Sequence, residues 1–243
     1  MIITKVGLKD LRDLRKKFLA EIDNQFTYDK CHLFGWADTW LFTINRSVAG
    51  YGGVWGKDKR EARDSIMEFY LEPEFRKDAH AIFAKFIEAT GVSWIECQSN
   101  DPLFSEMFFE FATDIYAEAI LFEDDFTSSI SADHTELMNA DPSDNPYDRP
   151  YVLKHKGEVV GSGGLLLNYN FPYADIYYGI DEAHRRRGFG SFFVQELKKA
   201  AYGMGRVPAA RTNIDNTISK RTMMKAGLKP CGWRLGGKIT KRK

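Results

Sequence analysis

Three consecutive arginines followed by two glycines form the part of this sequence best suited to binding an anion. The arginines are residues 185–187, and the glycines are Gly188 and Gly190. A glycine lets a ligand approach the main chain closely and accepts backbone angles that other residues avoid. The N–H groups that open a helix lack helical partners and favour negative charge, and arginines add charge-assisted hydrogen bonds. The spacing Arg-x-x-Gly-x-Gly therefore indicates a phosphate-binding loop, with a solvated basic turn as the alternative.

A second polar segment follows, in which Asn213, Asn216 and Ser219 are each three residues apart. Asparagine is a favoured helix N-cap, so Asn216 could begin a helix that carries Ser219. The same side chains could also contact a ligand held by the arginine-glycine loop. Capping and ligand contact are compatible, and the sequence leaves both open.

The elements that must position these residues occur twice in the chain. The pattern V-x-G-x-G-G is found at residues 48–53 and again at residues 159–164. In each copy, an apolar hairpin that contains it leads to a third strand, a helix, a short strand and a second helix. The helix after the second loop has one apolar face, formed by Phe192, Phe193, Leu197, Ala200 and Ala201. This order predicts an α+β fold with two domains in tandem, each a mixed β-sheet flanked by helices.

The domain boundaries are predicted from composition. Residues 1–126 form the first domain, which carries an additional amphipathic helix over residues 8–22. Residues 127–150 are rich in Ser, Asp, Asn and Pro, which is typical of a linker. Residues 151–243 then form the second domain.

The second copy resembles the GNAT superfamily of N-acetyltransferases. The similarity rests on a strand that runs into Arg185-x-x-Gly188-x-Gly190 and a helix, and on the later segment N-x-x-N-x-x-S that ends in KAGL. The preceding hairpin extends the match over residues 151–232. The resemblance implies a fold with two GNAT-like halves, acetyl-coenzyme A as cosubstrate, and transfer of its acetyl group to a primary amine on a small molecule or peptide.

The resemblance also assigns residues to the cosubstrate. The arginine-glycine loop would hold the pyrophosphate, and the pantetheine arm would pair with the main chain in a V-shaped opening between two parallel strands. The residues assigned in this way are Gly179, Ile180, Asp181, Arg185, Arg186, Arg187, Gly188, Phe189, Gly190, Ser191, Asn213, Asn216 and Ser219.

Acetyl transfer from a thioester to an amine needs a base, an oxyanion donor and a proton for the leaving thiolate. The family places a carboxylate base in some members where this chain has Asp175, for which a solvated strand-end aspartate is the alternative. A main-chain N–H on the same strand is the expected oxyanion donor. The family's tyrosine acid is replaced here by Met223, which has no proton to give. Tyr177, Tyr178, Ser219 or a water could take its place.

The first copy departs from the motif. Ala79 and Ala81 stand where the second copy has glycines, and Asp78 brings a negative charge into the loop. A Cβ at each point of close approach and a carboxylate beside phosphate both oppose binding. We therefore predict that the first half keeps the fold and does not bind the cosubstrate.

Composition excludes several other classes of function. The 243 residues contain 34 Lys and Arg against 34 Asp and Glu, which does not favour a nucleic-acid binder. No apolar run is long enough for a membrane span, and the three cysteines and five histidines show no metal-ligand spacing. We therefore predict a cytoplasmic N-acetyltransferase without a metal; the alternative is a non-catalytic acyl-coenzyme A-binding or protein-interaction module of the same fold.

Overall fold

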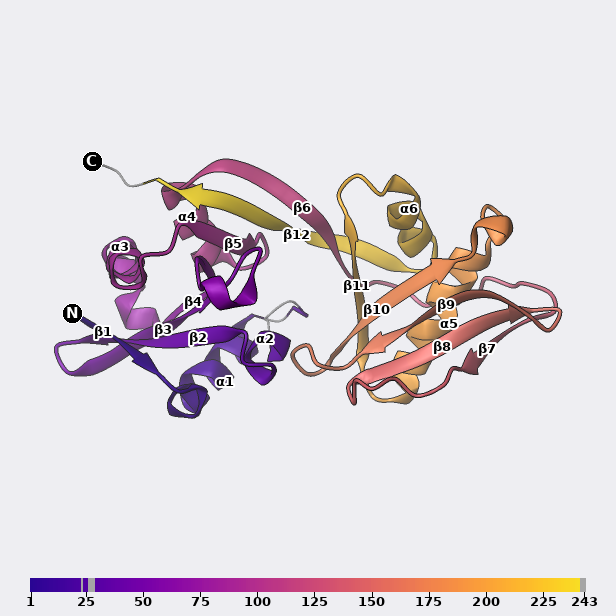
Figure 1. Ribbon diagram of the computed structural model, residues 1–243, viewed down its shortest axis with the longest axis horizontal. Coiled ribbons are helices and arrows are strands. Elements are labelled where there is room, and N and C mark those ends of the chain that lie inside the picture. The colour runs from indigo at the N-terminus through magenta and orange to yellow at the C-terminus, as the bar shows by residue number, and fades with distance from the viewer. Residues whose placement is uncertain (23, 26–28, 241–243) are drawn as a thin grey trace. The chain divides into compact units, whose positions relative to one another are not determined.

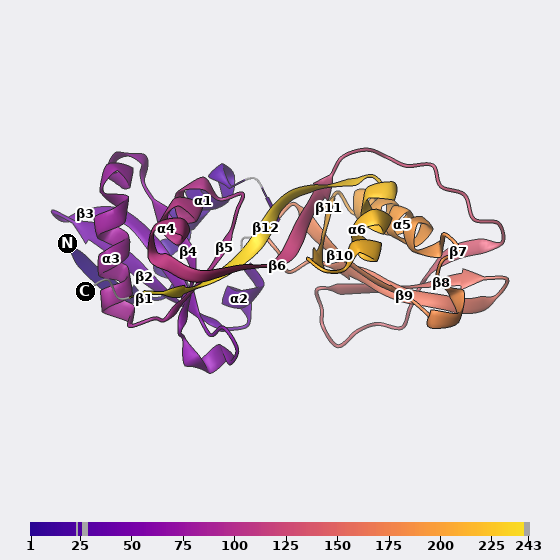
Figure 2. The same ribbon diagram turned by 90° about the horizontal axis from the view of Figure 1, so that it is seen from above.

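The computed structural model describes residues 1–22, 24–25 and 29–240 of the chain, which divides into two compact units. Unit 1 comprises Met1–Asp23, Thr27–Glu118 and Trp233–Lys243, and unit 2 comprises Asn24–Phe26 and Ala119–Gly232. Each unit is built on a β-sheet with helices packed against it (Figures 1 and 2). The strands β6 (Ala112–Asp124) and β12 (Leu228–Ile239) have residues in both units.

In unit 1 the strands lie in the order β1, β2, β3, β4, β5 and then the second half of β12. Their bounds are β1 Ile2–Val6, β2 Ala37–Ile44, β3 Ser47–Trp55, β4 Ser65–Leu71 and β5 Trp94–Gln98. The first three pairings are antiparallel, whereas β4 and β5 pair in parallel at Ser65↔Trp94 and Ile66↔Ile95. β12 continues the sheet antiparallel to β5 from Arg234 to Lys238.

Helices cover both faces of the unit 1 sheet (Figure 1). They are η1 Leu8–Leu11, α1 Arg12–Glu21, α2 Asp29–Leu33, η2 Arg60–Ala62, η3 Pro73–Asp78, α3 Ala79–Thr90 and α4 Pro102–Phe111. On one face, α3 and α4 share a core with strand residues such as Phe69. On the other face, α1 packs Phe18 against Tyr51, and α2 packs Cys31 against Trp55.

In unit 2 the strands lie in the order β7, β8, β9, β10, β11 and then the second half of β6. Their bounds are β7 Thr135–Asn139, β8 Asp148–His155, β9 Glu158–Leu166, β10 Tyr173–Ile180 and β11 Val207–Asn213. β10 and β11 are parallel, and the other neighbours are antiparallel.

Two long helices of unit 2 lie side by side on one face of its sheet (Figure 2). They are α5 (Phe189–Gly203) and α6 (Thr217–Lys225), and the short helix η4 (Glu182–His184) precedes α5. Ile176 and Ala210 of the sheet share one core with Phe193 and Leu197 of α5 and Met223 of α6. The alternate residues of β10 and β11 therefore point to the opposite face of the sheet.

The fold class predicted from the sequence is confirmed, because both units contain three strands, a helix, a strand and a second helix in that order. The structure differs from the predicted boundaries in several places. Residues 119–126, expected in the first domain, belong to unit 2. Residues 135–139, within the expected linker, form β7 and pair with β8 from Tyr151 to His155. The chain also returns to unit 1 at Trp233, because the second half of β12 pairs with β5.

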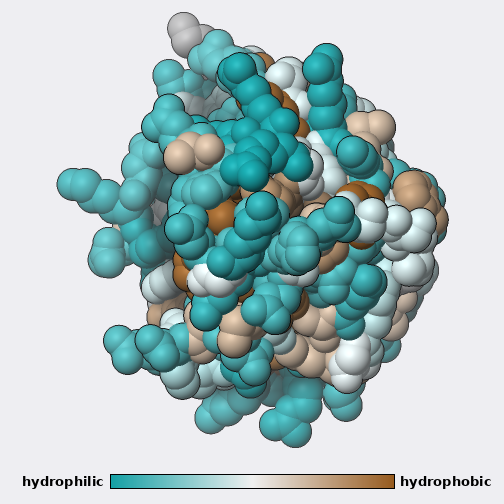
Figure 3. Space-filling model, turned by 90° about the vertical axis from the view of Figure 1, so that its right-hand side faces the viewer, coloured by the Kyte–Doolittle hydropathy of each residue, from teal (hydrophilic) through white to brown (hydrophobic). Residues whose placement is uncertain are grey.

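The end of unit 2 that faces the viewer in Figure 3 is covered mainly by hydrophilic side chains, with apolar ones in separate spots. Among the described residues, no helix combines the length and the apolar character that crossing a membrane requires. The same residues contain no group of three or more His, Cys, Asp or Glu placed to hold a metal ion.

Candidate active site

The N-terminus of α5 begins at Gly188, which adopts a φ of +86° and has no heavy atom within 4 Å of where a Cβ would stand. A left-handed backbone angle favours glycine. The open space beside it leaves room for a ligand to reach the first N–H groups of the helix. Gly190 is different, because a Cβ there would come within 3.2 Å of the Thr222 side chain. The two glycines therefore serve the loop in different ways, one by its conformation and one by its small size.

A pocket of about 510 Å³ lies at this helix end. Its walls are Tyr178, Gly179, Ile180, His184, Arg185, Arg186, Gly188, Phe189, Gly190, Ser191, Asn216, Ile218, Ser219 and Thr222. Most of the residues predicted to bind the cosubstrate are thus brought together in one cavity. Asp181, Arg187, Asn213 and Asp175 are not part of its wall.

The three arginines of the loop are exposed, and Arg185 and Arg186 line the pocket. Arg185 is fixed to the strand, because its Nε donates to the carbonyl of Ile180 over 3.0 Å. Arg186 has a positive φ of 62°. Arg187 turns toward Phe189, with its guanidinium carbon 5.0 Å from the ring centroid. Arg185 and Arg186 are therefore the guanidinium groups placed to meet an anion in the pocket.

Two predicted residues outside the pocket have local structural roles. The N–H of Asp181 donates to the carbonyl of Val160 over 3.0 Å, which holds the exit of β10 against β9. Asn213 Oδ1 accepts from the N–H of Asp215 over 2.9 Å and shapes the turn before α6. Asn216 caps α6, since its Oδ1 accepts from the N–H of Ser219 over 3.0 Å, and the residue also lines the pocket.

The strands β10 and β11 separate beside the pocket. Their paired residues run from Tyr173↔Val207 to Ile176↔Ala210, although both strands continue beyond this point. β10 stays paired with β9 on its other edge as far as Ile180. The parallel pair thus opens into a V, and the main chain of Gly179 and Ile180 lines the cavity at the open end.

A tyrosine hydroxyl lies inside the pocket. Tyr178 extends from β10 toward α6, where its hydroxyl shares a hydrogen bond with the hydroxyl of Ser219 over 3.0 Å. Burial raises the pKa of the Tyr178 phenol, and hydrogen bonds with Ser219 and Thr222 oppose this rise. The phenol therefore carries its proton at neutral pH. Met223, at the position of the family's tyrosine, is only 2% exposed and belongs to the apolar core.

Asp175 lies on the face of the sheet away from α5 and α6, and it is 3% exposed. Its Oδ1 accepts a hydrogen bond from Gln25 Nε2 over 3.2 Å, and its Oδ2 is 3.7 Å from Arg211 Nη2. Tyr177 lies on the same face, and its hydroxyl donates to Asp148 Oδ1 over 2.8 Å. Burial and the Asp148 carboxylate both raise the pKa of Tyr177. Gln25 and Arg211 could not be identified as site residues from the sequence, because neither belongs to a motif.

The corresponding helix end in unit 1 has different chemistry. A cavity of about 410 Å³ there is lined by Arg76, Lys77, Ala79, His80, Glu106, Met107, Phe109 and Glu110. Arg76, which matches Arg185, donates to Glu21 over 2.5 Å. His80 Nε2 is 3.5 Å from Glu110 Oε1. Arg76 and His80 are thus paired with carboxylates. Two further features of this cavity oppose an anion: carboxylates lie in its wall, and alanines replace the two glycines.

One family model, described as "Acetyltransferase (GNAT) family", matches residues 115–228, and a second, described as "Acetyltransferase (GNAT) domain", matches residues 7–125. No curated protein matches the chain in sequence.

Several solved structures share the fold along the chain. A GNAT-family acetyltransferase from Colwellia psychrerythraea has a TM-score of 0.77 at 14% identity, covering 99% of this chain and 100% of its own. A tandem GNAT protein of the clavulanic acid biosynthesis pathway has a TM-score of 0.64 at 12% identity, with 100% and 99% covered. A GCN5-related N-acetyltransferase from Sphaerobacter thermophilus has a TM-score of 0.57 at 12% identity, with 84% and 82% covered. At sequence identities this low, the similarity to these structures shows the fold alone.

Proposed function

Since the chain belongs to the GNAT acetyltransferase family, with one family domain in each half, we propose that unit 2 transfers an acetyl group from acetyl-coenzyme A to a primary amine. The observation that carries the proposal is the pocket at the N-terminus of α5, where an open left-handed glycine, two exposed arginines and a separated pair of parallel strands meet. The glycine and the arginines suit a pyrophosphate. The separated strands suit an extended arm that contains amide groups.

The residues present fit acetyl-coenzyme A. The first N–H groups of α5 and the guanidinium of Arg186 can hold phosphate oxygens, because helix N-termini and arginines both favour them. The main chain of Gly179 and Ile180 can hold the arm at the open V. Asn216 and Ser219 lie on the α6 side of the same cavity, and Ile218, which is 74% exposed, offers an apolar cover.

When bound, acetyl-coenzyme A supplies the thioester carbon that the amine attacks. A C–N bond forms, the C–S bond breaks, the amine loses a proton and the thiolate gains one. An N–H of the β10 main chain at the V is the proposed oxyanion donor. Tyr178 is the proposed proton donor, because it lies in the pocket and keeps its proton. Tyr177 is less suited to this role, since its proton is committed to Asp148.

Asp175 remains the proposed base. Its carboxylate lies on β10 one residue before the last pair with β11, close to the point where the V opens. Its Oδ2 lies 3.7 Å from Arg211 Nη2, and an ionised carboxylate can accept the proton of an ammonium group. Asp175→Asn should therefore lower kcat without weakening cosubstrate binding. An unchanged kcat in this variant would remove Asp175 from the mechanism.

The proposal is tested by calorimetry and by an assay of thiol release. Titration with acetyl-coenzyme A is expected to give one site per chain, and a panel of amines, amino acids, polyamines and peptide N-termini is expected to contain an acceptor. Two equal sites would contradict the assignment to unit 2 alone. Tight binding with no transfer to any member of the panel would favour the non-catalytic binding module, for which the buried Met223 in the place of the acid is the supporting observation.

A further inference from the structure

Arg187 lies outside the wall of the unit 2 pocket but contacts two residues that belong to it. Its guanidinium carbon lies 5.0 Å from the ring centroid of Phe189, and its Nη1 lies 3.4 Å from His184 Nδ1. Phe189 and His184 both line the pocket. Arg187 therefore stands beside the part of the wall that η4 and the first residue of α5 form.

Phe189 gives this guanidinium a fixed base. The ring is buried in the apolar core of unit 2, and the ring of His155 on β8 packs against it with 4.9 Å between the centroids. Thr135 Oγ1 lies 2.9 Å from His155 Nδ1, which ties the histidine to β7. An arginine over an aromatic ring gains a cation–π attraction. Arg187 is thus oriented by buried neighbours, although the residue itself is exposed.

The loop carries one more guanidinium than those in the pocket wall. Arg185 and Arg186 line the pocket, where the pyrophosphate is proposed to bind, and Arg187 stands next to them. Among the residues that the structure describes, no carboxylate forms an ion pair with any of these three arginines. Their counterpart in unit 1, Arg76, is instead bound to Glu21. The unit 2 loop therefore presents positive charge to a ligand both inside the pocket and beside it.

Coenzyme A carries a further phosphate group that suits this position. It is a monoester on the 3′ oxygen of the ribose, one sugar away from the pyrophosphate. A phosphate monoester carries a charge of about −1.5 to −2 at pH 7 and has three strong acceptor oxygens. The planar fork of a guanidinium can bind two such oxygens at once. The additional charge of the ligand is therefore matched by the additional arginine of the loop.

We propose that Arg187 binds the 3′-phosphate of coenzyme A and so distinguishes acetyl-coenzyme A from its 3′-dephospho form. This inference rests on the function proposed above. The pyrophosphate binds at the N-terminus of α5 with Arg185 and Arg186, and the ribose leads out of the pocket past His184 and Phe189. The exposed guanidinium of Arg187 then meets the 3′-phosphate and need not give up a carboxylate to do so.

The test measures binding of two ligands that differ only in this phosphate. The dissociation constants of coenzyme A and 3′-dephospho-coenzyme A are determined by calorimetry. We expect coenzyme A to bind about tenfold more tightly, the low end for hydrogen bonds to a charged group because Arg187 is exposed. In Arg187→Met, whose flexible side chain can still pack on Phe189, the dissociation constant of coenzyme A should rise to that of the dephospho form. The affinity for the dephospho form should stay unchanged.

A matched control separates this contact from general effects of charge and packing. Arg206 follows the C-terminal end of α5, and its guanidinium carbon lies 4.9 Å from the ring centroid of Phe171. Arg206→Met removes a similar cation–π contact away from the pocket and should leave both dissociation constants unchanged. Arg187→Lys keeps the charge and should retain part of the preference.

The outcomes that contradict the inference are distinct from failure of the proposed function. Equal affinity of the parent protein for the two ligands, or a preference that survives Arg187→Met, would overturn this inference alone. So would an equal loss of affinity for both ligands in folded Arg187→Met, which would place Arg187 at the pyrophosphate. If neither ligand binds the parent protein, the proposed function fails and this inference fails with it.

Discussion

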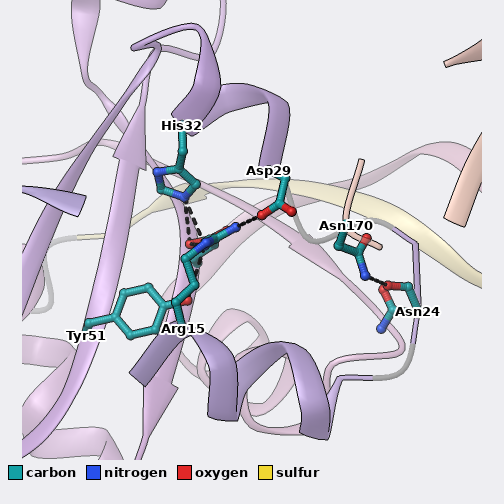
Figure 4. A network of polar contacts seen from close by, with 7 residues as sticks. Arg15, Asn24, Asp29, His32, Tyr51 and Asn170 are labelled. Atoms are coloured by element: carbon teal, nitrogen blue, oxygen red, sulfur yellow. Dashed lines mark hydrogen bonds and ion pairs between the residues drawn. The ribbon is translucent and has the colours of Figure 1, made fainter. Parts of the chain in front are cut away.

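Arg15 and Glu68 form a buried ion pair in unit 1, in which Arg15 Nη1 lies 2.9 and 2.7 Å from the two carboxylate oxygens (Figure 4). Arg15 is 7% exposed and Glu68 is 1% exposed. His32 Nε2 adds a contact of 3.0 Å to Glu68, and Asp29 binds the guanidinium from α2. The sheet face covered by α1 and α2 in unit 1 is thus occupied by the protein's own charged groups. This occupation supports the assignment of catalysis to unit 2.

Arg15→Met should destabilise unit 1 strongly. Removal of one partner from a buried pair leaves the other charge uncompensated, at a cost of about 3–5 kcal/mol. The free energy of unfolding is measured by urea denaturation, and hydrogen exchange locates the loss in unit 1. Lys17→Met is the matched control, because Lys17 lies on the same helix and pairs with Glu72 from an exposed position. Equal effects of the two substitutions would contradict this account.

The same ion pair makes the free energy of unfolding of unit 1 depend on pH in the acidic range. Burial alone would raise the pKa of Glu68, but Arg15 and His32 more than offset this and lower it from 4.5 to about 2. As the pH falls, the Glu68 carboxylate therefore takes up a proton in the unfolded chain before it does so in the folded chain. The stabilisation that the ion pair gives is complete above pH 4.5 and is lost progressively as the pH falls to about 2. Glu68→Gln should flatten this part of the stability profile. An unchanged slope between these pH values would show that Glu68 does not titrate as described.

Gly188→Asp should weaken the binding of acetyl-coenzyme A tenfold or more, which corresponds to about 1.4 kcal/mol. The new carboxylate would stand in the open space beside the helix N-terminus, where it opposes phosphate. The matched control in unit 1 is Ala81→Asp, since Ala81 is exposed whereas Ala79 is buried. Calorimetry should give an unchanged dissociation constant for the control. Equal weakening in both variants would mean that the site is assigned to the wrong half.

Tyr178→Phe should lower kcat and leave the affinity for acetyl-coenzyme A nearly unchanged. General acid catalysis contributes about 10²–10⁴-fold, and the phenylalanine ring keeps the packing against the apolar core of unit 2. Tyr202→Phe is the control, because its hydroxyl binds Asp124 away from the pocket. A solvent isotope effect on kcat should be present in the parent protein and smaller in Tyr178→Phe. A change confined to binding would make Tyr178 a ligand contact and not a proton donor.

The parts of this molecule that sequence could predict are those in which neighbours along the chain decide the structure. The N-terminus of α5, the cap at Asn216 and the order of strands and helices along the chain depend on local patterns of glycine, asparagine and apolar residues. The contacts that complete the site join distant segments, such as Gln25 with Asp175. Tyr178 reaches Ser219 only because β10 and α6 pack together. Such pairs depend on tertiary packing, which the spacing of residues along the chain does not indicate.

Lys198 of α5 illustrates such a distant contact, because its buried ammonium group holds the end of α6 in place. The Nζ atom lies 2.6 Å from the carbonyl of Gly227, 2.7 Å from that of Phe126 and 3.2 Å from that of Ala226. It also lies 2.8 Å from Asp124 Oδ1, and the side chain is 2% exposed. These bonds fix the turn after α6, the helix that carries Ser219 into the pocket.

Lys198→Met should therefore destabilise unit 2 and loosen its pocket. A hydrogen bond to a charged group contributes about 1.5–3 kcal/mol, and the Lys198 ammonium group makes several here. Urea denaturation should show the loss, and hydrogen exchange in α6 should speed up. Lys199→Met is the control, because Lys199 is half exposed and pairs with Glu196 on its own helix. If α6 exchanges at the same rate in both variants, the position of Ser219 must depend on the core around Met223 and not on Lys198.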